Sequence, residues 1–366
     1  MEHASPAQAP LTTPIERFVW DLTYACPLRC VHCLTESGRR PAAMLDRDAM
    51  LRVVEVIVGH RPLAKRMSFG GGEPLLAPWW DEAARLICDA GIPVTLFTSG
   101  WSMELDTAER LARSVAGICV SVDGPDPRLN DPIRGRPGAF DHAMATLELL
   151  DRFKRDRSAR GEPCYSLGID YTVTRSNREG TDRFVSEATA RFPGLDFIRF
   201  GAVVPEGLAQ EEAFVARELL TMEEVVELSA SEARLASLAR NGVHVSVTDA
   251  RGFLPDNDLS EAGEGIAHIE ASGSLRAFTT VEAKVGSVLE EPLELLWQRA
   301  LAWRREPFVQ EQMGSIRSVE DWARAIRTLD RRYGSEADRI RIARRGTRPG
   351  GGESRTAVEG QPQGRS

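Results

Sequence analysis

Apolar and polar positions follow two patterns that alternate from residue 17 to residue 207. Short stretches of alternating or continuous apolar residues are typical of strands, and longer stretches between them have the spacing of amphipathic helices. This regular exchange predicts a parallel sheet with helices packed outside it. The predicted strands are 17–25, 65–72, 92–100, 117–126, 165–177 and 195–207, and the predicted helices are 45–60, 79–91, 106–117, 138–156 and 180–194.

Six strand-then-helix units are too few for a complete eight-unit barrel. The sequence therefore predicts an α/β fold whose core is a partial (β/α)6 barrel. In sheets of this kind, functional residues gather at the carboxyl ends of the strands. Polar or glycine-rich segments lie in or after five of the six predicted strands, so we expect the site at that end.

Beyond residue 207 the pattern changes to that of a small α+β region. It predicts a long amphipathic helix, a strand, a hairpin turning at residues 272–274, and two further helices, the last opened by Ser318 with Asp321 three residues on. The final residues are rich in Gly, Arg and Ser and predict disorder. The predicted organisation is a flexible N-terminus (1–14), the barrel core (15–207), the C-terminal region (208–333) and a disordered tail (334–366).

Charge and composition exclude several classes of function. The formal net charge of −8 argues against a general nucleic-acid binder, although the stretch from Arg331 onward holds nine arginines against four acidic residues. No apolar run is long enough to span a membrane, and the start of the chain does not resemble a signal peptide. We therefore expect a cytoplasmic protein without membrane or nucleic-acid partners.

Three of the six cysteines lie within eight residues, "CPLRCVHC", as Cys26, Cys30 and Cys33. A structural zinc site and a fully protein-ligated iron–sulfur cluster both need a fourth ligand. No fourth cysteine lies nearby, and His32 is adjacent to Cys33. Three thiolates on a four-iron cluster leave one iron open, which suits a site that binds an exchangeable small molecule.

The spacing Cys-x3-Cys-x2-Cys after a first strand resembles the defining motif of the radical S-adenosylmethionine enzymes. The resemblance implies one [4Fe–4S] cluster on these cysteines, with S-adenosylmethionine on its open iron. It also implies reductive cleavage of S-adenosylmethionine to a 5′-deoxyadenosyl radical that abstracts hydrogen from a substrate. The alternative is a non-catalytic zinc or electron-transfer protein.

The segment "SFGGGEPLL" supports this resemblance, because it matches the family's Gly-Gly-Glu segment at Gly71, Gly72 and Glu73. Glycines let backbone approach a ligand closely, and a carboxylate can pair with the ammonium group of the cofactor. Further cofactor contacts are implied more loosely by resemblance, at Ser99, Ser121, Asp123, Thr174, Asn177 and Arg199.

Cys119 alternates with Ser121 and Asp123 and therefore shares one face of the fourth strand. If that face lines the barrel, the Cys119 thiol could return a hydrogen atom to a substrate radical. The competing interpretation is that Cys119, like Cys88 and Cys164, is a buried apolar residue.

Within the superfamily, "LTYACPLRCVHCLTESGRRP" is similar to the mycofactocin-maturase branch of peptide-modifying enzymes. That branch carries a C-terminal SPASM region whose cysteines hold auxiliary clusters. Residues 262–297 resemble the region's shape, but no cysteine follows Cys164, and Ser260 and Phe278 stand about where cysteines are expected. This implies a SPASM-like region without clusters, which makes net substrate oxidation harder to arrange.

Two substrate classes stay open. The resemblance around the cysteines implies a ribosomally synthesised precursor peptide, with a flavodoxin or ferredoxin as external reductant. The absence of auxiliary-cluster cysteines and of a recognisable leader-binding domain instead favours a small molecule, such as a sugar or nucleoside in a natural-product pathway.

Overall fold

The computed structural model describes residues 13–61, 63–254 and 265–345. Its centre is one ten-stranded sheet with the order β10-β9-β8-β1-β2-β3-β4-β5-β6-β7. The strands are β1 (Arg17–Thr23), β2 (Arg66–Gly71), β3 (Val94–Thr98), β4 (Gly117–Ser121), β5 (Ser166–Val173), β6 (Phe197–Ala202), β7 (His244–Thr248), β8 (Ile266–Ile269), β9 (Ser274–Arg276) and β10 (Lys284–Ser287).

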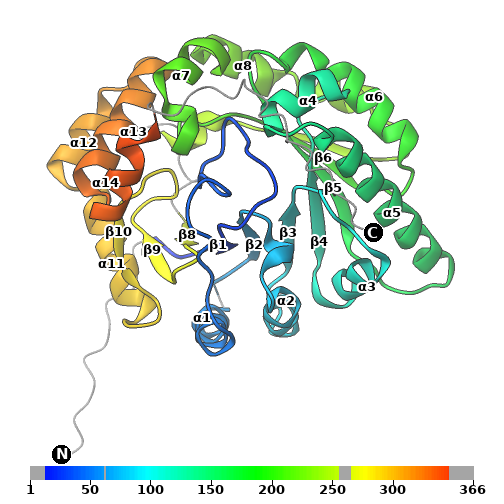
Figure 1. Cartoon of the computed structure of the whole chain (residues 1–366), viewed down its shortest axis with the longest axis horizontal. Coiled ribbons are helices and arrows are strands. Elements are labelled where there is room, and N and C mark those ends of the chain that lie inside the picture. Colours follow the sequence, from blue (N-terminus) through cyan, green and yellow to red (C-terminus); the bar gives the residue numbers. More distant parts are fainter. Residues whose placement is uncertain (1–12, 62, 255–264, 346–366) are drawn as a thin grey trace, which may run out of the picture.

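The neighbouring strands from β8 through β1 to β7 pair in parallel, which confirms the predicted α/β class and the parallel sheet. The sheet curves into a partial barrel, and the helices that follow its strands lie on its outer side (Figure 1). The helices of this part are α1 (Arg47–Gly59), η1 (Pro74–Leu76), α2 (Trp80–Asp89), α3 (Leu105–Ser114), α4 (Pro127–Arg134), α5 (Ala139–Ala159), η2 (Arg178–Gly180) and α6 (Thr181–Arg191).

Apolar side chains between sheet and helices form the core of this barrel. Phe18, Trp20, Met67 and Phe69 on the first two strands are all fully buried. Along β3 and β6, buried residues alternate with half-buried ones, because one face packs against helices and the other faces the barrel interior. The core therefore fixes the strands whose carboxyl ends carry the polar segments.

The C-terminal region adds strands to both edges of the six-stranded core. β7 pairs in parallel with β6, and β8 pairs in parallel with β1. The region also contributes η3 (Gly207–Gln210), α7 (Glu212–Glu218), α8 (Met222–Ala230), α9 (Glu232–Leu238), η4 (Ala250–Phe253), α11 (Leu293–Arg304), α12 (Pro307–Gly314), α13 (Val319–Tyr333) and α14 (Glu336–Ala343). The division at residue 207 stays a prediction, since one sheet runs across it.

Most predicted C-terminal elements exist, with one correction among them. The hairpin is confirmed, with Gly273 at a φ of +83° in its turn, and Ser318 opens α13 in a capping box with Asp321. The single helix predicted at 220–242 is instead two helices, because the Ser231 hydroxyl donates to the Leu228 carbonyl and ends α8.

The predicted disordered tail is wrong for its first residues. Residues 336–343 form α14, which begins at a capping box between Ser335 and Asp338. The arginine-rich composition predicted disorder here, because it gives no sign of the ion pairs that hold this helix. The predicted flexible N-terminus up to residue 12, the tail from 346 and Ser260 lie outside the described residues.

Candidate active site

A cavity of about 490 Å³ opens at the carboxyl ends of the strands. Residues from every strand between β1 and β6 line it, together with the loop after β1 and residues of the C-terminal region. Eight predicted site residues line this cavity: Cys26, Cys30, Cys33, Gly71, Gly72, Ser99, Ser121 and Arg199. Five do not: Glu73, Cys119, Asp123, Thr174 and Asn177.

The cysteine loop, residues 26–38, is held by backbone hydrogen bonds to two neighbouring elements. The amide of Val31 donates to the carbonyl of Ile133 over 2.9 Å, at the end of α4. The amide of Leu208, in η3, donates to the carbonyl of Cys33 over 3.1 Å. Because these contacts use backbone groups, they fix the path of the loop whatever its side chains are.

The three thiols of this loop are free and face the cavity. Burial raises the pKa of Cys26 to about 12 and that of Cys30 to about 11, so both keep their protons at neutral pH until a metal displaces them. Within the described residues no three metal-ligating side chains group around one ion. That finding concerns mononuclear sites, whereas a cluster spreads its thiolates over separate irons, so the donor set still fits a three-thiolate cluster.

Gly71 and Gly72 pass close to the chain that leads into the cysteine loop. The amide of Gly72 donates to the Thr23 carbonyl over 2.7 Å, and a Cβ at Gly72 would lie 2.1 Å from the Ala25 carbonyl oxygen. Gly71 has a φ of +104°, which favours glycine. The glycines therefore let this segment pack against the cysteine loop while its backbone lines the cavity.

Glu73 is buried and has its own hydrogen-bond partners beside the cavity. Its carboxylate accepts from the Thr98 hydroxyl at 2.9 Å and from the Ser99 amide at 2.8 Å. Burial raises the pKa of this carboxyl, and these hydrogen bonds oppose the rise. Pairing of Glu73 with a cofactor ammonium stays a prediction, because the side chain does not line the cavity here.

Asp123 was predicted as a cofactor or substrate contact, and the structure gives it a different place. It is fully buried and accepts from Arg134 at 2.8 Å, from His32 at 3.0 Å and from the Thr172 amide at 2.9 Å. Burial would raise its pKa, but Arg134 and His32 outweigh burial and hold the pKa below its usual range. Asp123 thus fixes residues around the cavity without reaching it.

Thr174 and Asn177, predicted as cofactor contacts, do not line the cavity and hydrogen-bond neighbouring backbone groups. The Asn177 amide group donates to the Asp123 carbonyl and the Thr172 carbonyl, both at 2.9 Å, and its oxygen accepts from the Thr174 amide. Both residues are fully buried. Their hydrogen bonds join the ends of β4 and β5, and leave the Asn177 side chain no group for a ligand.

Arg199 lines the cavity but is already paired. Its Nε donates to Asp170 at 2.8 Å, and its guanidinium lies 4.9 Å from the Phe97 ring centre. Cys119 lies on the same strand face as Ser121, two residues deeper, and is fully buried. Burial raises its pKa well above the usual value. Because Cys119 does not reach the cavity wall, the structure does not support it as a hydrogen donor.

Sequence reasoning missed several residues that line the cavity. Arg134 lies beside the cysteine loop, where its charge opposes the rise that burial causes in the pKa of Cys30. The carboxylate of Asp21 and the imidazole of His268 form a hydrogen bond of 3.0 Å, and this bond joins β1 to β8. Burial raises the pKa of Glu206 to about 8. Polar residues inside apolar strands were the available signal for Asp21 and His268.

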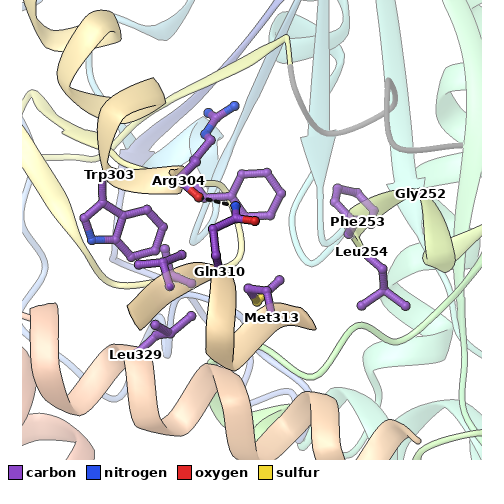
Figure 2. Close-up of a pocket in the computed structure, with 11 residues that line it drawn as sticks. Gly252, Phe253, Leu254, Trp303, Arg304, Gln310, Met313 and Leu329 are labelled. Atoms are coloured by element: carbon purple, nitrogen blue, oxygen red, sulfur yellow. Dashed lines mark hydrogen bonds between the residues drawn. The ribbon is translucent and has the colours of Figure 1, made fainter. Parts of the chain in front are cut away.

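A second pocket, of about 110 Å³, lies in the C-terminal region beside the main cavity (Figure 2). Its wall is mostly apolar, with Trp303, Met313 and Leu329 among its residues. Phe253 contributes to both cavities. The three thiols line only the larger one, which is therefore the candidate active site.

Comparison with known proteins identifies the core. Residues 20–159, which carry the cysteine loop and the Gly71–Glu73 segment, match the family model of the Radical SAM superfamily. The chain carries a radical SAM domain. That family implies an iron–sulfur cluster and S-adenosylmethionine, and the three cavity thiols fit the cluster.

Curated relatives of the chain have names of enzymes. It is 26% identical over 314 residues to an AdoMet-dependent heme synthase of Methanosarcina barkeri, covering 81% of this chain and 85% of the relative. It is 32% identical over 171 residues to the mycofactocin maturase MftC of Mycobacterium tuberculosis, and this match covers 46% of the chain and 41% of the relative. The radical SAM domain makes the chain an enzyme. Its match to the maturase spans less than half of that protein.

Solved structures share the fold. Streptococcus suis SuiB bound to S-adenosylmethionine aligns with a TM-score of 0.60 at 16% identity, covering 82% of this chain and 68% of SuiB. The structure of anSMEcpe with bound AdoMet and a peptide aligns with a TM-score of 0.55 at 18% identity, covering 78% and 80%. None of the described helices combines the length and apolar character needed to cross a membrane.

Proposed function

We propose that this radical SAM enzyme carries a single [4Fe–4S] cluster on Cys26, Cys30 and Cys33 and modifies a ribosomally synthesised precursor peptide. The observation that carries the proposal is that these three thiols share one cavity with Gly71 and Gly72. A loop with three thiolates and an adjacent glycine segment offers both an open iron position and backbone for a cofactor.

The chain's own residues suit S-adenosylmethionine at this position. Arg134 places a cation in the cavity wall beside Cys30, where a cofactor carboxylate would bind. The Ser99 and Ser121 side chains also line the cavity and offer hydroxyl groups. When bound, the reduced cluster supplies the electron that cleaves the cofactor. We propose a flavodoxin or ferredoxin as the external reductant and the cytoplasm as the location.

The relation to the mycofactocin maturases supports a peptide substrate. It has the higher identity of the two kinds of relative described above and covers the cysteine loop. The single cluster is supported by the sequence, since no cysteine follows Cys164. With one cluster, a redox-neutral modification is easier to arrange than a net oxidation, which would need a further electron acceptor.

A small-molecule substrate is the second candidate. The heme-synthase relative matches four fifths of this chain, including its C-terminal region, whereas the maturase match covers 46%. The cavity wall also carries Asp21, His268 and Glu206, which suit a compact ligand with hydroxyl or carboxyl groups. A sugar, a nucleoside or a tetrapyrrole would fit this candidate.

Anaerobic reconstitution tests the proposal. The protein is loaded with iron and sulfide, reduced, and given S-adenosylmethionine, and we expect about four irons per chain and formation of 5′-deoxyadenosine. Cys33→Ala is the matched variant and should lose both. Zinc in the purified protein, with no cofactor cleavage, would refute the radical assignment.

The substrate is tested separately on the active enzyme. Short peptides encoded beside the gene are incubated with it and compared with a sugar, a nucleoside and a porphyrin. A mass change in a peptide supports the first candidate. A modified small molecule with unmodified peptides supports the second and removes the first.

A further inference from the structure

The last helix of the described chain reaches back to the cysteine loop. Glu36, three residues after Cys33, accepts from Arg345 through Nε at 2.8 Å and Nη2 at 2.6 Å, and also from Arg341. Arg341 lies in α14, and Arg345 lies two residues after its end. Residues more than 300 positions apart therefore meet in one buried contact.

Glu36 lies at an unusual point of the loop. Its φ of +53° is left-handed, a conformation that is strained for a non-glycine residue. Its neighbours Thr35 and Ser37 line the cavity and hydrogen-bond each other at 2.6 Å, and Thr35 also donates to the Gly71 carbonyl. The turn at Glu36 therefore points two side chains into the cavity and one toward α14.

Ion pairs, more than apolar packing, hold α14 in place. Asp338 and Ile342 are its buried residues, so one apolar side chain is covered. Arg341 also donates to Glu282 at 2.9 Å, and Asp338 pairs with Lys284 at 2.6 Å. The pairs continue to the β8–β10 hairpin and join four carboxylates to four cations within the described residues: Glu36, Glu270, Glu282 and Asp338 with Arg276, Lys284, Arg341 and Arg345.

We infer that Arg341 and Arg345 are positioning residues of the iron–sulfur site, which hold Glu36 and with it the backbone that follows Cys33. The inference rests on the proposed cluster site. If both arginines were removed, the buried Glu36 carboxylate would lose these two partners while its backbone stays in a left-handed turn. Because that state is unfavourable, we expect the loop to rearrange. The C-terminal helix then governs how firmly the chain retains its cluster.

The test compares Arg345→Ala with Arg339→Ala. Arg339 lies on the same helix and donates to the Gly334 carbonyl instead of Glu36. Each variant is reconstituted without oxygen, and the rate of iron loss to a chelator is followed by absorbance. Outer-shell partners of a metal site typically change affinity by about 10-fold or more, so we expect iron loss to be faster by about that factor in Arg345→Ala alone.

Hydrogen exchange on the iron-free chain separates positioning from general damage. In Arg345→Ala we expect faster exchange over residues 33–38 and α14, with the exchange of β3, β4 and β5 unchanged. Arg345→Lys restores the charge and should recover part of the iron retention. The electron paramagnetic resonance spectrum of the reduced cluster should broaden in Arg345→Ala and not in Arg339→Ala.

Two results would overturn the inference. One is equal iron retention and equal exchange of residues 33–38 in Arg345→Ala and wild type. The other is exchange that rises throughout the sheet, which would make the arginine a general stabilising residue. Wild-type protein that binds no iron would instead refute the proposed function, while the exchange data would still report on the loop.

Discussion

Replacing Asp123 by Asn tests whether the buried charges beside the cysteine loop are coupled. Asp123 is fully buried, and its Oδ1 accepts both from Arg134 at 2.8 Å and from the Thr172 amide at 2.9 Å. Asn keeps the shape and one acceptor for the Thr172 amide but removes the negative charge. Arg134, which is 7% exposed, then stays a buried cation without its carboxylate.

The expected cost follows from that burial. Removing one partner of a buried ion pair costs about 3–5 kcal/mol, because the remaining charge is neither paired nor hydrated. Because Asn preserves one hydrogen bond, we expect a loss of unfolding free energy at the lower end of this range, about 3 kcal/mol. That is a large part of the roughly 5–15 kcal/mol that stabilises an ordinary domain. The exposed pair of Arg85 with Asp89 is the control, and Asp89→Asn should cost less than about 0.5 kcal/mol.

Urea unfolding of the iron-free protein measures these free energies, followed by circular dichroism. The set is completed by Arg134→Met and the double variant. Removing both charges takes away the unpaired cation, so the double variant should recover about 1–2 kcal/mol relative to the sum of the single changes. Additive effects within about 0.5 kcal/mol would show that Asp123 and Arg134 do not stabilise each other.

Three further changes have expected outcomes. Gly72→Ala should abolish iron binding, measured as iron per chain, since its Cβ would lie 2.1 Å from the Ala25 carbonyl oxygen; Gly59→Ala, where no atom lies within 4 Å, should bind iron normally. Because burial raises the pKa of Glu206 to about 8, the folded chain retains a proton that the unfolded chain releases above its usual pKa of 4.5, and stability falls between those pH values. Glu206→Gln removes this loss of stability. Measured by urea unfolding, the variant should gain about 1–2 kcal/mol over wild type on going from pH 5 to pH 8.5, less than the full effect because solvent enters the cavity. The same pH dependence in variant and wild type would contradict this. Cys119→Ala should leave 5′-deoxyadenosine formation and product stereochemistry unchanged, since the thiol does not line the cavity, and an altered product would restore the hydrogen-donor hypothesis.

The sequence predicted the parts of the fold that local patterns determine. Six strands, their helices and the carboxyl-end position of the site follow from hydrophobic period and chain order alone. The three thiols were found because a motif of fixed spacing lies on the loop after β1, and the two glycines because a second short motif lies at the end of β2. The looser family resemblance also implied Ser99, Ser121 and Arg199, and they do line the cavity.

What the sequence could not give depends on contacts between distant residues. Asp123 and Asn177 have the residue types of ligand contacts, yet their partners lie on neighbouring elements and use up their polar groups. The place of His268 depends on β8 pairing with β1, which no local pattern indicates. Arg341 reads as part of a basic tail until its partner Glu36 is known.

The strands at the edges of the core have a consequence for synthesis on the ribosome. A nascent chain that ends at residue 207 contains β1 to β6, but β1 and β6 each present an open row of backbone groups. The partner of Arg17 in β8 is Ile266, which follows residue 207 by a further 59 residues, roughly 3–12 s of translation. β1 is thus covered late, and we expect a chaperone or fast synthesis to matter for yield. The cysteine loop, which continues from β1, receives its complete surroundings only once nearly the whole chain has left the ribosome.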